Sequence, residues 1–339
     1  MPITIHKGIN CENKKPNAKI FGNGPFTKAH LVVLATVCDL FFEEDYNHPD
    51  IEKLSDYDSI ENMYFCIWGK FNQPIRKYPS NLKNVYFGNK FNQSIDSIPN
   101  GTLKVSLGEK YNMQINQMVG TIIELDMGRC INYSHSIENI SIGIITLRLG
   151  FSLNNCEIWP AGLVSLEFAP DSKIGEGVKF NNLPPTVKHI TIPDTSTLNI
   201  SDNKFIESLE FNNYVADTIL ITSNNIKKFK CRYLHLYNPE ELFMIPDCVE
   251  NFEFNCYQDP TYRYEQMCIL KFPANLLHVK ALRYYPLLDN LPPNIKTIYV
   301  SRDYQFTDEL AELYPNAIIT VEPAPIYSDY SGSEAESCD

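Results

Sequence analysis

The segment Gly69-Lys70-Phe71-Asn72-Gln73-Pro74-Ile75 decides the fold, because closely similar segments follow it twice. The second is Gly88-Asn89-Lys90-Phe91-Asn92-Gln93-Ser94-Ile95, and the third is Gly108-Glu109-Lys110-Tyr111-Asn112-Met113-Gln114-Ile115. The asparagines of the three segments are evenly spaced at 20 residues. A fixed period of this length is the signature of a repeat architecture, in which one short unit stacks on the next.

A short alternation of apolar residues precedes each segment and predicts a β-strand. Similar apolar triplets continue to the C-terminus, with most steps between 19 and 24 residues. They are centred on Met63, Val85, Val105, Leu125, Leu147, Leu166, Ile190, Leu209, Phe229, Phe252, Val279, Ile298 and Ile319. One such strand cannot bury its apolar face alone, whereas strands aligned in a parallel sheet form one continuous core. We therefore predict a repeat solenoid of about twelve coils.

The Phe-Asn-Gln-Pro-Ile block also has a specific context, since an apolar strand precedes it and Pro79-Ser80-Asn81-Leu82 follows it. In this context it resembles the FNIP repeat, a variant of the leucine-rich repeat found in giant viruses of amoebae and in social amoebae. Two units match closely and the third is degenerate. The resemblance implies a right-handed, leucine-rich-repeat-like coil with a parallel β-sheet on the concave face and a mostly irregular convex side, used for protein recognition.

The repeated positions predict structural roles for two sets of residues. Asparagine at a repeated turn can hydrogen-bond backbone groups of its own unit and of the next. We therefore expect a structural ladder of Asn72, Asn92 and Asn112. The aromatic residues beside them share the repeat spacing, which favours a core spine over a ligand site: Phe71, Phe91 and Tyr111.

The two ends of the array differ in composition from the repeats. Residues 1–55 are expected to form an N-terminal cap with one helix over about 27–44, started by Thr27. The alternative is a degenerate F-box-like segment, although it lacks a Leu-Pro start and is too short for three helices. Residues 56–322 are assigned to the solenoid. Residues 323–339 are acidic, rich in Ser and Tyr, and predicted to be a disordered tail.

Composition excludes several classes of function. The 339 residues include 29 basic and 41 acidic side chains, giving a net charge of −12, and the basic residues form no long cluster, so nucleic-acid binding is not expected. No apolar stretch reaches the length of a membrane span and no signal-peptide core is present, so the expected location is the cytoplasm.

Candidate chemistry is equally sparse. The ten cysteines are scattered without a Cys-x-x-Cys pair, so no metal site is expected. No nucleophile elbow, phosphate loop or metalloprotease motif occurs, so we expect neither catalysis nor a cofactor.

The outward-pointing residues of the predicted strands offer a binding surface. Alternation along each strand places every second side chain on the solvent side of the sheet. The expected partner-binding residues in this row are Tyr64, Tyr86, Asp126, Arg148, Glu167, Glu210, Lys230 and Tyr299. Tyrosine and arginine are enriched at binding hot spots, but an ordinary solvated sheet face would also be polar.

Together these patterns favour a non-catalytic scaffold that binds another protein through the concave sheet face. The acidic surface would favour a basic partner, and the sequence does not fix the oligomeric state. Two alternatives stay open: a ubiquitin-ligase substrate receptor that uses residues 1–55, and a structural component of a virus particle. A viral protein would act in the host cytosol or reside in the virion.

Overall fold

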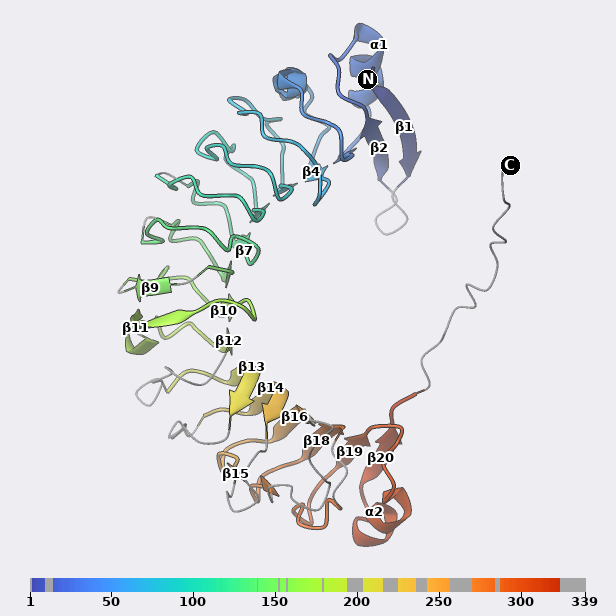
Figure 1. Cartoon of the computed structure of the whole chain (residues 1–339), viewed down its shortest axis with the longest axis vertical. Coiled ribbons are helices and arrows are strands. Elements are labelled where there is room, and N and C mark those ends of the chain that lie inside the picture. Colours follow the sequence, from blue (N-terminus) through green and yellow to red (C-terminus); the bar gives the residue numbers. More distant parts are fainter. Residues whose placement is uncertain are drawn as a thin grey trace, which may run out of the picture.

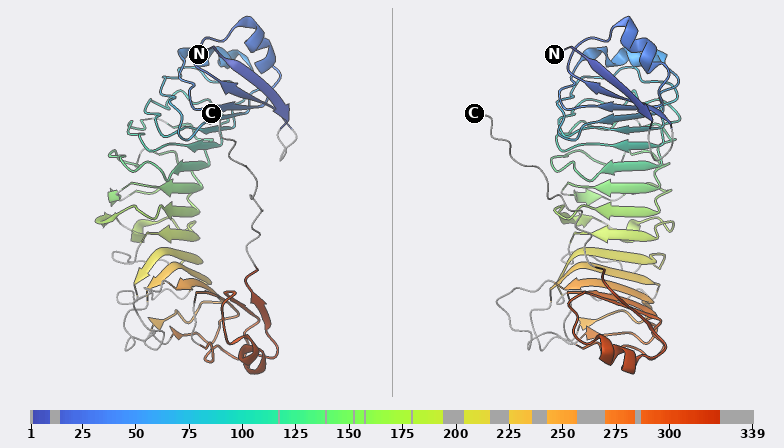
Figure 2. Two further views of the ribbon diagram at one scale, coloured as in Figure 1. Left: turned by 45° about the vertical axis from the view of Figure 1, so that its right-hand side comes forward. Right: turned by 90° about the vertical axis from the view of Figure 1, so that its right-hand side faces the viewer.

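The computed structural model describes residues 2–9, 15–116, 118–138, 140–151, 153–156, 158–178, 180–193, 204–215, 225–235, 243–256, 270–283 and 287–323. Within these residues the chain winds into an open arc whose inner side is lined by one long sheet (Figure 1). Figure 2 shows the strands of this sheet side by side along the full length of the arc. The solenoid expected from the repeat is confirmed.

The long sheet contains sixteen strands, in the order β1-β2-β3-β4-β5-β6-β7-β8-β10-β12-β13-β14-β16-β18-β19-β20. Their bounds are β1 Thr4–Ile9, β2 Pro16–Phe21, β3 Asp39–Phe42, β4 Asn62–Phe65, β5 Asn84–Tyr86, β6 Lys104–Ser106, β7 Glu124–Met127, β8 Thr146–Leu149, β10 Ser165–Phe168, β12 His189–Ile192, β13 Ser208–Val215, β14 Lys228–His235, β16 Asn251–Cys256, β18 His278–Leu282, β19 Thr297–Val300 and β20 Ile318–Val321. Every neighbouring pair from β2 to β20 is parallel, and only the β1–β2 hairpin is antiparallel. Parallel neighbours require the chain to travel once around the coil between strands.

Each coil buries the same positions of its strand. Met63 lies opposite Val85, which lies opposite Val105, which lies opposite Leu125. All four are buried in one core that continues from Ile3 to Tyr314. The apolar face of each strand is thus covered by its neighbours, as the stacking argument requires.

The convex side has little regular structure. Two short parallel pairs lie there, β9 Leu153–Cys156 with β11 Ile174–Val178, and β15 Phe243–Met244 with β17 Leu270–Lys271 (Figure 1). The described residues also contain two 3-10 helices, η1 Pro49–Asp56 and η2 Phe180–Asn182. The chain returns to the inner sheet through tight turns.

Proline begins several of these turns. The carbonyl of Pro79 accepts a hydrogen bond from the amide of Leu82 at 3.2 Å, and Pro273 and Leu276 repeat this contact at 3.1 Å. Proline fixes its own φ and has no amide to leave unpaired, so it suits a turn that leads into a strand.

Glycine allows successive coils to approach closely after the strands. A Cβ atom on Gly108 would lie 2.3 Å from the carbonyl oxygen of Gly88, and one on Gly88 would lie 2.2 Å from the carbonyl oxygen of Cys66. These contacts show that Cys66, and not Gly69, is the structural counterpart of the two later glycines. The first coil is longer, because Met63 and Val85 are 22 residues apart whereas Val85 and Val105 are 20 apart.

The helix expected over residues 27–44 is only half formed. Helix α1 spans Lys28–Leu34 and begins at Thr27, whose hydroxyl accepts a hydrogen bond from the amide of His30 at 3.3 Å. The remainder becomes strand β3, because Leu40 and Phe42 find buried places in the sheet beside Met63 and Phe65. Strands β2 and β3 therefore extend the coil upstream of residue 56, where its start was expected.

The two ends of the arc carry different elements. Strand β1 forms one edge of the sheet, with α1 at the same end, and β20 forms the other, with helix α2 Thr307–Leu313 beside it (Figures 1 and 2). A capping role for α1 stays a prediction, since the buried residue of this helix is Leu34 alone. The tail expected over 323–339 lies, apart from Pro323, outside the described residues.

Candidate functional site: the concave sheet face

The expected partner-binding residues occupy one row across the sheet. Tyr64 pairs in register with Tyr86, and the row continues strand by strand to Tyr299. The remaining members are Ser106, Asp126, Arg148, Glu167, Thr191, Glu210, Lys230, Glu253 and Lys280. All eight expected residues are therefore in a single line on the concave side, and the row differs in character between its two halves.

The N-terminal end of the row is a stack of aromatic rings, which Phe41 of β3 extends by one strand. The ring of Phe41 lies 4.6 Å from that of Tyr64, at an interplanar angle of 8°, and Tyr64 lies 4.8 Å from Tyr86 at 10°. The ammonium group of Lys104 lies 5.4 Å from the centre of the Tyr86 ring. The rings cover one another's faces, so they are half-buried although they lie on the solvent side of the sheet.

This aromatic ladder, defined as Phe41, Tyr64 and Tyr86, borders a hollow of ≈ 670 Å³. Two acidic side chains, Glu43 and Asp126, and one basic side chain, Arg129, line the same hollow. Burial raises the pKa of the Tyr86 phenol, and the nearby Lys104 cation opposes that shift. Tyr86 therefore stays a neutral hydrogen-bond donor at physiological pH.

The C-terminal half of the row is a chain of ion pairs. The carboxylate of Glu253 lies 3.5 Å from the ammonium of Lys230 and 3.2 Å from that of Lys280. Glu210 lies 3.8 Å from Lys230 and also pairs with Arg232. The charged side chains expected to attract a partner thus form ion pairs with one another within this half of the sheet.

A smaller hollow of ≈ 300 Å³ lies over these ion pairs. Elsewhere in the row, Arg148 pairs with Glu167 at 3.1 Å, and the ammonium of Lys280 lies 5.3 Å from the centre of the Tyr299 ring. Alternating charges on adjacent strands stabilise the sheet, although each exposed pair contributes little.

The repeated asparagines form a ladder of hydrogen bonds that joins the turns of successive coils. The side-chain oxygen of Asn72 accepts a hydrogen bond from the amide of Asn92 at 2.8 Å, and Asn92 accepts from the amide of Asn112 at 2.9 Å. The ladder extends in both directions. Asn112 accepts from the amide of Ser134 at 2.9 Å, and Asn47 accepts from the amide of Asn72 at 2.8 Å.

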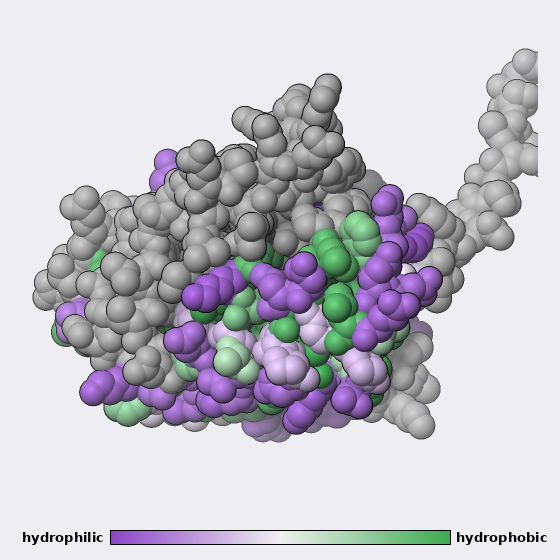
Figure 3. Space-filling view, turned by 90° about the horizontal axis from the view of Figure 1, so that it is seen from below, coloured by the Kyte–Doolittle hydropathy of each residue, from purple (hydrophilic) through white to green (hydrophobic). Residues whose placement is uncertain are grey.

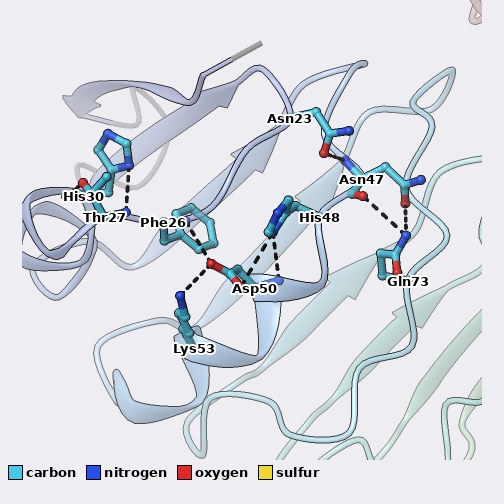
Figure 4. A network of polar contacts seen from close by, with 9 residues as sticks. All are labelled: Asn23, Phe26, Thr27, His30, Asn47, His48, Asp50, Lys53 and Gln73. Atoms are coloured by element: carbon cyan, nitrogen blue, oxygen red, sulfur yellow. Dashed lines mark hydrogen bonds and ion pairs between the residues drawn. The ribbon is translucent and has the colours of Figure 1, made fainter.

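Figure 4 shows where the ladder begins, with Asn23 beside Asn47 and Asn47 beside Gln73. Asn23 accepts a hydrogen bond from the amide of Asn47 at 3.1 Å. Nearby, the carboxylate of Asp50 accepts a hydrogen bond from the amide of Phe26 at 3.2 Å, which joins η1 to the N-terminal segment. Within η1, Asp50 also pairs with Lys53. The side chains of Asn47, Asn72, Asn92 and Asn112 are half-buried, whereas that of Asn23 is exposed.

The aromatic residues of the repeat form a spine inside the coil. Phe71 and Phe91 lie 6.0 Å apart, and Phe91 and Tyr111 lie 6.3 Å apart. Tyr46 precedes them and Tyr133 continues the series. Spine and ladder each repeat one position from coil to coil between residues 46 and 134, so both hold these coils in register.

The sequence missed several members of these groups. Apolar spacing predicts Phe41 in a helix, although Asp39-Leu40-Phe41-Phe42 aligns with Asn62-Met63-Tyr64-Phe65. Asn23 and Asn47 lack the surrounding Phe-Asn-Gln motif. Trp68 follows Ile67, which lines the larger hollow, and its side chain is 72% exposed. In the sequence, the signal for Trp68 was its residue type, which is enriched at binding hot spots, and its position just after a predicted strand.

The described part of the chain contains no cluster of three or more His, Cys, Asp or Glu side chains suited to a metal ion. Within the same residues, no helix is long and apolar enough to cross a membrane. Burial raises the pKa of the Cys130 and Cys156 thiols, so these cysteines are poor nucleophiles.

The sequence comparison agrees with the geometry of the ladder and spine. Residues 71–110, which contain Phe71, Asn72, Phe91 and Asn92, match the model of the FNIP repeat. Over these residues the chain is similar to the FNIP repeat. No curated protein matches the sequence at a significant level.

A solved structure shows the same fold without close sequence similarity. The giant-virus protein CroV588, described as a novel circular LRR protein, has a TM-score of 0.60 and 16% identity. The alignment covers 90% of this chain and 53% of CroV588, so the chain spans about half the length of that protein. YopM from Yersinia enterocolitica WA-314 aligns over 85% of this chain and 66% of its own, at 13% identity and a TM-score of 0.36.

Proposed function

We propose that this FNIP-repeat protein is a non-catalytic scaffold that binds another protein through its concave face, with the contact centred on the aromatic ladder Phe41, Tyr64 and Tyr86. The observation that supports this proposal is the stack of three half-buried rings beside an open hollow. Aromatic residues of this kind supply large contact area at low entropic cost.

The two halves of the concave row have different parts in this proposal. In the C-terminal half, Lys230 and Lys280 already share the carboxylate of Glu253. A partner would have to break these pairs to use them, and would gain little. At the N-terminal end of the row, the rings border an open hollow, so an apolar side chain that packs on them breaks no ion pair of the row.

The expected partner is a protein segment with an apolar or aromatic side chain that fills the hollow. A basic residue beside it would reach Glu43 or Asp126. The Asp126 carboxylate is already oriented, because it accepts hydrogen bonds from the amide of Gly128 at 2.9 Å and from the hydroxyl of Ser106 at 3.3 Å. A preordered carboxylate loses little freedom when a cation approaches.

The alternatives drawn from the sequence gain no specific support. The F-box-like alternative concerns residues 1–55. The described residues of this segment form a hairpin, a seven-residue helix, a strand and part of η1. Binding of a cullin adaptor to this region and incorporation into virus particles both stay predictions of the sequence, as does a location in the host cytosol.

Affinity capture from the cell that makes the protein tests the proposal. We expect the double variant Tyr64→Ala with Tyr86→Ala to lose at least about tenfold in recovery of specific partners, since truncating a hot spot costs about 2 kcal/mol or more. The melting temperature should change little. Tyr299→Ala is the matched control, the same residue type in the same row but in the ion-paired half, and should retain the partners. Equal recovery with all three proteins would contradict the proposal.

A further inference from the structure

The two ends of the sheet carry opposite charge. Residues 1–38 contain five lysines and one acidic residue, whereas residues 301–323 contain five acidic residues and one arginine. At the first end Lys7 on β1 and Lys28 on α1 are exposed. At the second end Glu312 on α2 and Glu322 after β20 are exposed. A chain with a net charge of −12 thus has one basic end.

The acidic end also exposes apolar side chains. Ile318 on β20 is 68% exposed and Val321 is 42% exposed, and Leu313 on α2 is exposed beside them. Figure 3 views the molecule from the end where α2 lies, and apolar side chains are visible there among hydrophilic ones. Most exposed apolar residues need no explanation singly, but a group on an edge strand marks a contact surface.

Among the described residues, strand β20 has backbone groups that pair with no other strand at this edge. The amides of Ile318 and Glu322 donate to the carbonyls of Lys296 at 2.8 Å and Val300 at 2.9 Å, toward β19. In a parallel sheet successive residues bond to opposite sides. The amides of Ile319 and Val321 therefore point to the open edge, where another strand can add. The sequence of β20 itself contains no charged residue that would discourage such pairing.

The basic end offers the complementary edge. β1 is the other terminal strand of the sheet, and Val32 on neighbouring α1 is 71% exposed. A lysine on an edge strand ordinarily discourages pairing. Against an acidic edge, however, Lys7 becomes an attractive contact.

We propose that copies of this chain associate head to tail, with the β20 edge of one copy against the β1 edge of the next. This contact continues the inner sheet from one copy into another and brings the acidic end to the basic end. Such a heterologous contact closes into a ring or grows into a filament, depending on the rotation between copies. In either form the concave rows of successive copies follow one another.

Sedimentation of the full chain over a concentration series tests the proposal. The wild type should exceed its monomer mass of 38.9 kDa as concentration rises. Val321→Pro should remain monomeric, because proline removes the outward amide and spares those that bond β19. Val321→Thr, which keeps the amide, is its matched control. A wild type that stays monomeric throughout would overturn the proposal.

Charge reversal identifies the two surfaces. The basic-end variant, Lys7→Glu with Lys28→Glu, should raise the dissociation constant at least about tenfold, and so should the acidic-end variant, Glu312→Lys with Glu322→Lys. All four changes in one chain should restore association, because the attraction returns with signs exchanged.

Mixing variants separates the head-to-tail contact from a symmetric one. A mixture of Val321→Pro with the basic-end variant should stop at pairs, since each retains one intact end. If only the acidic-end variant loses association while the basic-end variant associates like the wild type, the contact is not head to tail. That result would indicate pairing of two β20 edges.

Discussion

The side-chain oxygen of Asn92 accepts a hydrogen bond from the backbone amide of Asn112, one coil further along, at 2.9 Å. The same contact joins Asn72 to Asn92 and Asn47 to Asn72. One residue type thus solves the same problem in successive coils: the turn leaves an amide without a backbone partner, and the preceding coil supplies an oxygen.

Removing this oxygen should weaken the coil. Asn92→Ala leaves the Asn112 amide without its acceptor, and we expect a loss of about 1–3 kcal/mol in the free energy of unfolding. Urea denaturation measures it. Asn92→Asp keeps a carboxylate oxygen at the same position and should lose much less. Equal losses for both variants would show that the hydrogen bond is not the cause.

Glycine between coils should be intolerant of a methyl group. Gly108→Ala would place a Cβ atom 2.3 Å from the carbonyl oxygen of Gly88, so the backbones of two coils must separate. We expect a loss of about 1–3 kcal/mol or more, as for other overpacked sites. Gly120→Ala is the control, because no atom lies within 4 Å of its added Cβ. A melting temperature of Gly108→Ala equal to that of the control would refute the close-approach role.

The spine contains a residue that is less favourable than its repeat equivalents. Tyr111 occupies the position of Phe71 and Phe91, and its buried hydroxyl has no hydrogen-bond partner among the described residues. Tyr111→Phe should therefore raise the free energy of unfolding by about 1 kcal/mol.

The matched control for this substitution is Tyr314→Phe. The hydroxyl of Tyr314 accepts from the amide of Leu291 at 2.9 Å and donates to the carbonyl of Leu288 at 3.0 Å. Loss of these contacts should lower stability. If both substitutions shift the urea midpoint in the same direction, the assignment of an unpaired hydroxyl to Tyr111 fails.

Buried acidic protons should make the protein sensitive to alkali. Burial raises the pKa of the Cys156 thiol and of the Tyr133 phenol, each to about 12, and also raises that of the Cys130 thiol. In the unfolded chain thiols and phenols titrate near about 8.5 and 10. Above about pH 8.5 the unfolded state therefore releases protons that the folded state keeps, so stability is complete below that pH and falls above it.

Urea midpoints measured from about pH 7 to about pH 11 check this slope, which is about 1.4 kcal/mol per pH unit for each titrating group. Cys130→Ala removes one group and should flatten the curve. A midpoint that does not change over this range would contradict the burial of these protons.

Much of the concave surface was predictable from the sequence. The period-two alternation around Tyr64 and Tyr86 fixes which side chains face solvent, and the register of the sheet follows once the apolar triplets are aligned. The same alignment extends to Tyr299. Periodicity carries this information because every coil must bury the same positions.

The interactions within the row were not predictable. The pairing of Glu253 with Lys230 and Lys280 depends on side-chain conformations that alternation does not determine. It changes the interpretation of the surface, because a carboxylate that is already paired with two cations offers a basic partner little.

The N-terminal coils were not predicted from the sequence, for a different reason. Leu34, Val37 and Phe41 follow helical spacing, whereas Leu40 and Phe42 follow strand alternation, and so short an apolar run does not distinguish the two. Only the pairing of Asp39–Phe42 with Asn62–Phe65 decides in favour of the strand. Tertiary contacts therefore overrode the local preference.

The central claim is that one repeat of the sequence corresponds to one complete turn of the solenoid. Deleting residues 92–111, which is one period, joins Phe91 to Asn112 and leaves Val85 paired with Leu125 in unchanged register. Circular dichroism during thermal unfolding measures the result directly. We predict a folded protein with one cooperative transition, whereas deletion of 92–101 should abolish that transition by placing the next strand half a coil out of step. Loss of folding in both deletions, or its retention in both, would contradict the account.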